Sequence, residues 1–166
     1  YKHDVGTYPS TEQGLAAHPD GVHAFVTDSG RSGVAVVDTH RGVVVERVRL
    51  PGWARHLTIS RDGSRLWVGL GSASQHVAVV STAPLRHVGT LTPGFLAHDV
   101  GLAPDGRLWV TSGSAGVLAF GDRRHSADRA PQHVTFGNGR VFVTSGDSGT
   151  LHAHARDGRI LSRVSV

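Results

Sequence analysis

Short runs of apolar residues alternate along the chain with polar segments rich in glycine. The runs at residues 34–37 and 77–80 are apolar at every position. None approaches the length of about 20 residues that a membrane-spanning helix needs, and no segment keeps a helical period over a comparable length. Strands separated by tight turns are typical of an all-β protein. Strands that are apolar at consecutive positions also indicate sheets that are covered on both faces.

One sequence frame recurs four times and organises the chain. Its clearest copy is VGLAPDGRLWVTSG at residues 100–113, and variants lie at residues 15–30, 57–71 and 134–146. Asp-Gly at Asp20, Asp62 and Asp105, and Asn-Gly at Asn138, mark the same place in each copy. Such dipeptides favour tight hairpins because their residues tolerate positive φ. The turns are 42, 43 and 33 residues apart, and the first two spacings match the 40 to 45 or so residues of a four-stranded propeller blade.

Each copy therefore predicts one antiparallel blade, and we expect an all-β fold, a β-propeller with four blades in this chain. The expected blades span residues 12–52, 53–94, 95–130 and 131–166. Residues 1–11 are expected to form the fourth strand of a preceding blade or an N-terminal extension. In the third blade a polar segment, residues 121–128, replaces a regular fourth strand. We expect a loop or a very short outer strand there.

The repeat resembles that of a known family. The frame at residues 98–111, with Pro-Asp-Gly-Arg followed by an aromatic residue and Val-Thr, is similar to the YVTN repeat of the YncE-like family of bacterial β-propellers. Trp or Phe takes the place of the motif tyrosine in all four copies, and Val68-Gly69 departs from the Val-Thr pair. The motif aromatics are Phe25, Trp67, Trp109 and Phe142. The resemblance implies a propeller that typically closes with seven blades, in a family whose members include surface-layer, binding and enzyme-like proteins.

The resemblance implies about seven blades, but this chain supplies four. An open arc of four blades would leave sheet faces and edges exposed, which natural proteins avoid. Three arrangements are open. The remaining blades lie on residues outside this sequence, which we favour, or a second copy of the chain completes the ring, or four blades close by themselves. The expected partners are therefore further blades or a second copy, together with a protein or small-molecule ligand. An extracellular or periplasmic location is expected, and a cytoplasmic one is left open.

The amino-acid composition excludes several kinds of functional site and partner. The chain has 12 histidines, no cysteine and a formal charge of +4, so it has no disulfide, thiolate metal ligand or cysteine nucleophile. Arginines supply nearly all the positive charge and are scattered among the turns, whereas nucleic-acid binding usually needs a concentrated basic face. We expect neither a nucleic-acid partner nor a membrane span. The familiar phosphate-binding, serine-hydrolase and metalloprotease motifs are also missing.

Candidate site residues lie where the innermost strand of each blade begins, beside the central channel. Aligned on the turn, one position holds Gly14, His56, Asp99 and His133, and the position before it holds Arg55, His98 and Gln132. Histidine and aspartate gathered around one pore can bind a divalent metal ion or act as acid and base. A divalent metal is the one cofactor expected, with His56, His98 and His133 as its ligands. Alternatively, these side chains only hydrogen-bond loop backbone or water.

His152 and His154 form a weaker candidate, because residues two apart on a strand share a face and can chelate one metal. Because no third ligand is evident, packing and turn contacts are the interpretation that we favour for them. Trp67 and Trp109 recur at one repeat position and are expected in the core, whereas Trp53, between blades, is expected at the surface or the channel.

Two functions follow from these observations. The first is a binding scaffold that presents a protein or small ligand with a site on the channel face, without catalysis. The alternative is a metal-assisted lyase or lactone hydrolase that uses His56, His98, Asp99 and His133. Streptogramin-inactivating lyases and lactonases resemble this arrangement only at the level of the fold.

Overall fold

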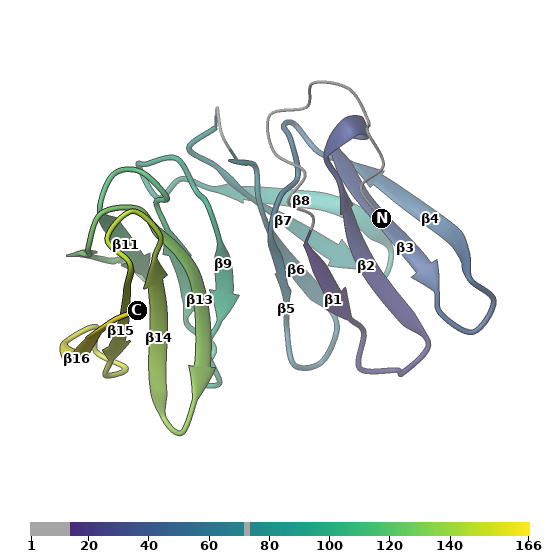
Figure 1. Ribbon diagram of the computed structural model, residues 1–166. Helices are drawn as coiled ribbons and strands as arrows, with labels where there is room; N and C mark the ends of the chain where they lie inside the picture. The colour runs from purple at the N-terminus through teal and green to yellow at the C-terminus, as the bar shows by residue number, and fades with distance from the viewer. Residues whose placement is uncertain (1–13, 72–73) are drawn as a thin grey trace.

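The computed structural model describes residues 14–71 and 74–166, and it folds them into four antiparallel sheets of four strands each (Figure 1). In every sheet the strands lie side by side in chain order. The protein is therefore all-β, with four propeller blades. The prediction of a strand or extension at residues 1–11 lies outside the described residues.

The strands of blades 1 and 2 follow the alternation of apolar runs and turns. Blade 1 consists of β1 (Leu15–Ala17), β2 (His23–Asp28), β3 (Gly33–Asp38) and β4 (Val43–Arg49), with a 3-10 turn at Ser29–Arg31 between β2 and β3. Blade 2 consists of β5 (Leu57–Ile59), β6 (Arg65–Gly69), β7 (Val77–Thr82) and β8 (Leu85–Leu91).

Blades 3 and 4 repeat this order. Blade 3 consists of β9 (Val100–Leu102), β10 (Leu108–Thr111), β11 (Val117–Phe120) and β12 (Arg123–Ser126). Blade 4 consists of β13 (Pro131–Gly137), β14 (Arg140–Ser145), β15 (Thr150–His154) and β16 (Ile160–Ser165). The polar segment at residues 121–128 contains only the four-residue strand β12, whereas β4 and β8 in the same place of blades 1 and 2 have seven residues each.

The repeated turns have the backbone conformation that their residues favour. Gly106 has a φ of +83°, and Asn138 and Gly139 have φ values of +49° and +72°. Glycine and asparagine adopt positive φ at lower cost than other residues. The Asp-Gly and Asn-Gly pairs therefore set the register of the two innermost strands of each blade.

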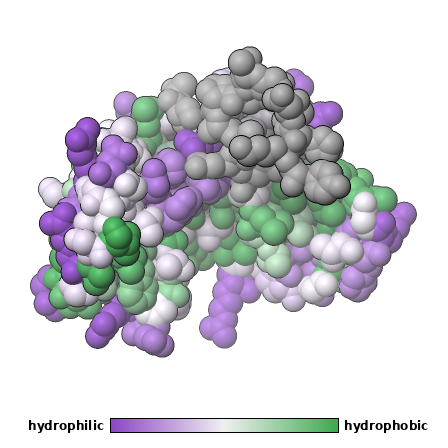
Figure 2. All heavy atoms as spheres, viewed as in Figure 1, coloured by the Kyte–Doolittle hydropathy of each residue, from purple (hydrophilic) through white to green (hydrophobic). Residues whose placement is uncertain are grey.

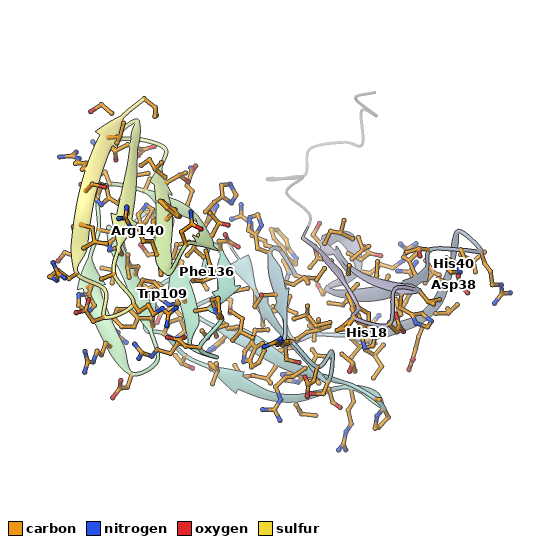
Figure 3. The ribbon with its side chains drawn as sticks, turned by 90° about the horizontal axis from the view of Figure 1, so that it is seen from below. His18, Asp38, His40, Trp109, Phe136 and Arg140 are labelled. Carbon is orange, nitrogen blue, oxygen red and sulfur yellow. The ribbon has the colours of Figure 1, made fainter. Side chains whose placement is uncertain are left out.

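The four blades stand around a common inner edge. Strand β1 contacts β5, β5 contacts β9 and β9 contacts β13, so the innermost strands of successive blades are neighbours. Seen from below, the blades form an arc with blade 1 at one end and blade 4 at the other (Figure 3). Among the described residues, no helix has the length and apolar character needed to cross a membrane.

Apolar side chains fill the spaces between blades. Phe25 and Val36 of blade 1 pack with Leu66 and Val80 of blade 2 in one buried cluster. Between blades 3 and 4, Trp109 is 1% exposed and stacks on Phe120 with ring centroids 4.3 Å apart. The expectation that the recurring tryptophans belong to the core is confirmed for Trp109. Blades 2 and 3 are thus sheets with both faces covered by neighbouring blades, as the consecutively apolar strands predicted.

Candidate functional site

The threonine of the Val-Thr pair fixes the entrance of the innermost strand. In blade 3 the hydroxyl of Thr111 accepts a hydrogen bond from the Asp99 N–H at 3.0 Å. Thr27 does the same for Gly14 at 2.6 Å and Thr144 for His133 at 3.2 Å. Thr111 also reaches the next blade, where its hydroxyl donates to the Gln132 carbonyl at 2.5 Å. The sequence shows this threonine only as part of a repeat, but its role is to hold the entrance residues in place.

A glycine at the end of the second strand leaves room for the side chain that precedes each entrance residue. A Cβ on Gly113 would lie 3.0 Å from both the Cβ and the Nδ1 of His98, and one on Gly146 would lie 2.7 Å from Oε1 of Gln132. Gly71 likewise lies under Arg55. These glycines therefore determine where the side chains of Arg55, His98 and Gln132 can lie.

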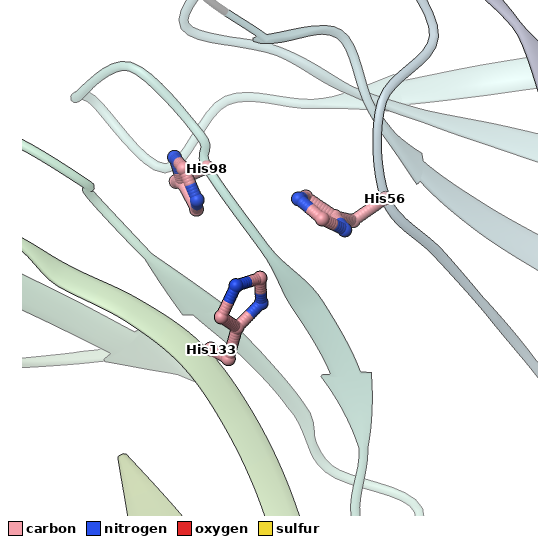
Figure 4. Close-up of side chains that lie close together, drawn as sticks. All are labelled: His56, His98 and His133. Carbon is pink, nitrogen blue, oxygen red and sulfur yellow. The ribbon is translucent and has the colours of Figure 1, made fainter. Parts of the chain in front are cut away.

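Three histidines from successive blades converge at the inner edge of the arc. His56 precedes β5 of blade 2, His98 precedes β9 of blade 3 and His133 lies in β13 of blade 4. Their rings face one another (Figure 4), with centroids 5.3 Å apart for His56 and His98, 5.2 Å for His56 and His133, and 5.8 Å for His98 and His133. One ring nitrogen from each lies within 4.8 Å of the other two.

Asp99 lies beside this histidine cluster, and its carboxylate is held by backbone. One oxygen accepts the Val100 N–H at 2.8 Å, and the other accepts the Val134 N–H of blade 4 at 3.0 Å. The same oxygens lie 3.9 Å from Nδ1 of His56 and 3.6 Å from Nδ1 of His133. Because Asp99 is only 8% exposed, its negative charge acts on both rings with little screening by solvent. A fixed carboxylate beside Nδ1 favours a proton on that nitrogen and orients the ring.

The other expected site residues, Arg55 and Gln132, lie one position before the entrance residues and pack against Gly71 and Gly146. Gln132 has its carbonyl bonded to Thr111, and its side chain packs over Gly146. A Cβ on Gly14 would lie 2.7 Å from the Arg55 carbonyl oxygen and 2.8 Å from the Leu57 nitrogen, so only glycine fits at this entrance. Blade 1 therefore contributes no side chain to the site from this position.

His152 and His154 each have their own partner. His152 lies 2.8 Å from a carboxylate oxygen of Asp128, which also accepts the Thr150 hydroxyl at 2.7 Å. The Nδ1–H of His154 donates to the Gly158 carbonyl at 3.0 Å. Burial lowers the pKa of His154 below 6.5, and the nearby His152 and His125 lower it further. Among residues 14–71 and 74–166, the cluster of possible metal ligands is that of His56, His98 and His133, without this pair.

The Thr150 hydrogen bond is the main cause that lowers the pKa of Asp128, and the nearby His152 and Arg163 lower it further. Arg163 lies 2.8 Å from the same oxygen of Asp128. This carboxylate therefore fastens the end of blade 3 to the two outer strands of blade 4. Trp53, expected at the surface or the channel, is 48% exposed.

Solved structures share this fold at low sequence identity. Hydrazine synthase of Kuenenia stuttgartiensis is 16% identical with a TM-score of 0.79, and the match covers 92% of this chain and 53% of that one. Virginiamycin B lyase of Staphylococcus aureus is 15% identical with a TM-score of 0.76. A putative 6-phosphogluconolactonase of Bacteroides uniformis is 18% identical with a TM-score of 0.78. Each of these two matches covers 92% of this chain and 54% of the other one.

The chain thus spans about half the length of these structures. Its sequence matches no protein-family model and no curated protein. The likeness therefore shows the fold and not the activity. Four consecutive four-stranded sheets around one inner edge, superposable on half of several propellers, identify the chain as part of a β-propeller ring.

Proposed function

We propose that this protein binds a small ligand on the channel face of a propeller, through a divalent metal ion held by His56, His98 and His133. The observation that carries the proposal is the convergence of three imidazole rings from three blades, with one nitrogen of each within 4.8 Å of the others. Imidazole is a favoured ligand of zinc, copper, nickel and iron. The YVTN-like repeat supports a YncE-like relationship as part of the same proposal.

The donor set fits such an ion. A tetrahedral zinc ion has bonds to nitrogen of about 2.0 to 2.1 Å, so its ligand atoms lie about 3.4 Å apart. Small rotations of the three side chains bring their nitrogens from within 4.8 Å to that separation. Asp99 supports the same geometry, because a carboxylate beside Nδ1 orients a ligating imidazole and increases its basicity.

Three protein ligands suit binding better than a purely structural role. Structural zinc sites are usually closed by four protein ligands, whereas open sites keep a position for water or substrate. The His133 side chain is 53% exposed and that of His56 is 14% exposed, so the cluster can be reached from solvent on one side. An ion there would attract oxygen donors, and we expect ligands that carry a carboxylate or carbonyl group.

Titration of the purified protein with Co²⁺, followed by its visible absorption, tests the metal site. We expect one ion per chain and d–d bands typical of nitrogen coordination. His56→Ala, His98→Ala and His133→Ala should each weaken binding about 100-fold or more, and His40→Ala, at an exposed turn, should not change it. Equal binding by the triple histidine variant and the unaltered protein would refute the site.

A second candidate function is metal-assisted catalysis by a lyase or lactone hydrolase. It is favoured by the open three-histidine set and by the fold neighbours, which include virginiamycin B lyase and a catalytically inactive histidine-to-alanine variant of that enzyme with quinupristin. A bound metal would supply Lewis acidity toward a carbonyl oxygen.

Turnover of lactones and cyclic depsipeptides, measured with and without added Zn²⁺, separates the two functions. A binding protein shows metal-dependent affinity without product, whereas an enzyme releases product at a rate that His133→Ala abolishes. A lower metal affinity in Asp99→Asn would further assign Asp99 to positioning the rings, because the isosteric amide removes the charge and keeps the shape.

A further inference from the structure

In blades 2, 3 and 4, one position at the end of the third strand faces the preceding blade across their joint. The position follows the partner of the motif aromatic and holds Val80 in blade 2, Gly121 in blade 3 and His154 in blade 4. Val80 is 0% exposed and packs in one cluster with Phe25 of blade 1. His154 is 0% exposed, and its ring centroid lies 6.3 Å from that of Trp109 of blade 3. Side chains at this position therefore help to close the joint between blades 1 and 2 and the joint between blades 3 and 4.

The joint between blades 2 and 3 has no side chain at this position. Gly121 has a φ of +56° and begins the turn into β12, and a Cβ built on it would meet no atom within 4 Å. The apolar residues of this joint are less covered than those of the other two. Leu108, which precedes the motif aromatic, is half-buried, although its equivalents Leu66 and Val141 are 0% and 2% exposed. Trp67 of blade 2 is half-buried as well. The glycine thus leaves space in this joint.

The space forms a groove of about 340 Å³ between blades 2 and 3, which we call the outer groove. Small-molecule sites usually have volumes of about 300 to 1,000 Å³ and mainly apolar walls. Leu108, Val110 and Ala119 line the outer groove from blade 3, and Leu91, which is 45% exposed, lines it from blade 2. None of the described residues that line it is aromatic. The outer groove therefore suits an aliphatic chain better than a ring that needs a stacking partner.

Exposed apolar residues alone do not mark a site in this protein. Hydrophobic residues reach the surface at separate places in the view of Figure 2, as they do on most protein surfaces. The outer groove differs because it combines a missing side chain inside a joint, apolar walls from two blades and charged residues at its edge.

Two arginines of β12 give the outer groove a positive edge. Arg124 pairs with Ala119, so its side chain starts on the face of blade 3 that carries the groove. A Cβ on Gly94 would overlap the Arg124 guanidinium, so this arginine reaches the segment that joins blade 2 to blade 3. Arg123 and Arg124 form no ion pair with any described residue, and Asp122 is the one acidic residue among the described residues of the lining. The net positive charge and the fork of each guanidinium favour a carboxylate.

We infer that the outer groove binds an aliphatic carboxylate, with its chain against Leu91 and Leu108 and its carboxylate at Arg124. The matching ligand chemistry is that of a free medium-chain fatty acid. Both walls of the groove belong to blades that the structure describes, so the inference does not depend on further blades. It does not depend on a metal at the histidine cluster either.

Isothermal titration calorimetry with sodium decanoate tests the outer groove, with EDTA present so that the histidine cluster carries no metal. We expect one decanoate per chain, and decylamine, which has the same chain with a positive charge, should bind at least about 10-fold more weakly. Arg124→Gln should weaken decanoate binding about 10-fold or more, because it removes a charge-assisted hydrogen bond. Arg86→Gln, at an exposed position of β8 outside the groove, is the matched control and should leave the affinity unchanged.

A second pair of variants tests the apolar wall. Leu91→Ser and Val88→Ser both change residues of β8 that are 45% exposed, so both should fold, but only Leu91 lines the groove. Leu91→Ser should weaken decanoate binding about 5-fold or more, because it removes apolar surface that the chain covers, and Val88→Ser should not. The inference would be overturned by no binding of decanoate to the unaltered protein, by equal binding of decylamine, or by equal losses in a variant and its control.

Discussion

Replacing Thr111 by valine tests whether the repeat threonine holds the site and the blade joint together. Thr111 is 1% exposed, accepts the N–H of Asp99 and donates to the carbonyl of Gln132 in the next blade. Valine has nearly the same shape, so packing is retained and only the two hydrogen bonds are lost.

The expected cost follows from the two groups left behind. A buried polar group without its partner costs about 1 to 3 kcal/mol, and the added methyl group returns about 0.8 kcal/mol. The Thr111→Val substitution should therefore lower the free energy of unfolding by about 1 to 5 kcal/mol. This is a large share of the usual 5 to 15 kcal/mol or so, and it corresponds to a fall in Tm of about 2 to 20 °C for a chain of this size.

Urea denaturation followed by tryptophan fluorescence measures this loss. Thr144→Val is the matched control, because Thr144 is exposed and the described bond of its hydroxyl is the one it accepts from the His133 N–H at 3.2 Å. The control should lose less than about 0.5 kcal/mol. Thr111→Ser, which keeps the hydroxyl, should lose about 1 kcal/mol for its missing methyl. If Thr111→Val lost no more than Thr144→Val, the hydrogen bonds of Thr111 would not be what holds the joint.

Three further predictions follow from the structure. Trp109→Ala should lower the free energy of unfolding by about 3 to 5 kcal/mol, because Trp109 fills the space between blades 3 and 4; urea denaturation would show it, and a loss below 1 kcal/mol would contradict the packing. Gly113→Ala should weaken Co²⁺ binding, because Gly113 has a φ of +68° and lies against His98; unchanged affinity would show that His98 is free to move. Because burial lowers the pKa of His154 in the fold below 6.5, the unfolded chain takes up its proton first as pH falls. Stability should be fully present above pH 6.5 and decline below it, and His154→Gln should reduce that decline in pH-dependent denaturation curves.

The order of strands could be predicted from the sequence, whereas the shape of the site could not. The Asp-Gly and Asn-Gly turns fix where hairpins form, and alternation fixes which residues face a neighbouring blade. These local rules suffice for blades 1, 2 and 4, and the polar segment at residues 121–128 accounts for the short strand β12. The positions of His56 and His133 follow from the repeat alignment, but the distances between rings depend on how three blades pack and on side-chain rotation, which no local pattern encodes.

The candidate site residues lie at repeat positions that differ between the copies, because the positions that recur serve the structure. In three of the four copies the threonine hydroxyl accepts the N–H at the strand entrance, the glycine leaves room beside it, and the aromatic of blade 3 packs against blade 4. A side chain committed in this way cannot also take a ligand. At the entrance position the repeat holds only the backbone N–H, so the side chain can differ from copy to copy. The four copies hold Gly14, His56, Asp99 and His133 there. Asp99 shows the limit of this rule, because it bonds the backbone of blade 4 and also faces two of the rings. Its replacement should therefore alter metal affinity and joint stability together, whereas replacement of His133, whose side chain is 53% exposed, should alter metal affinity alone.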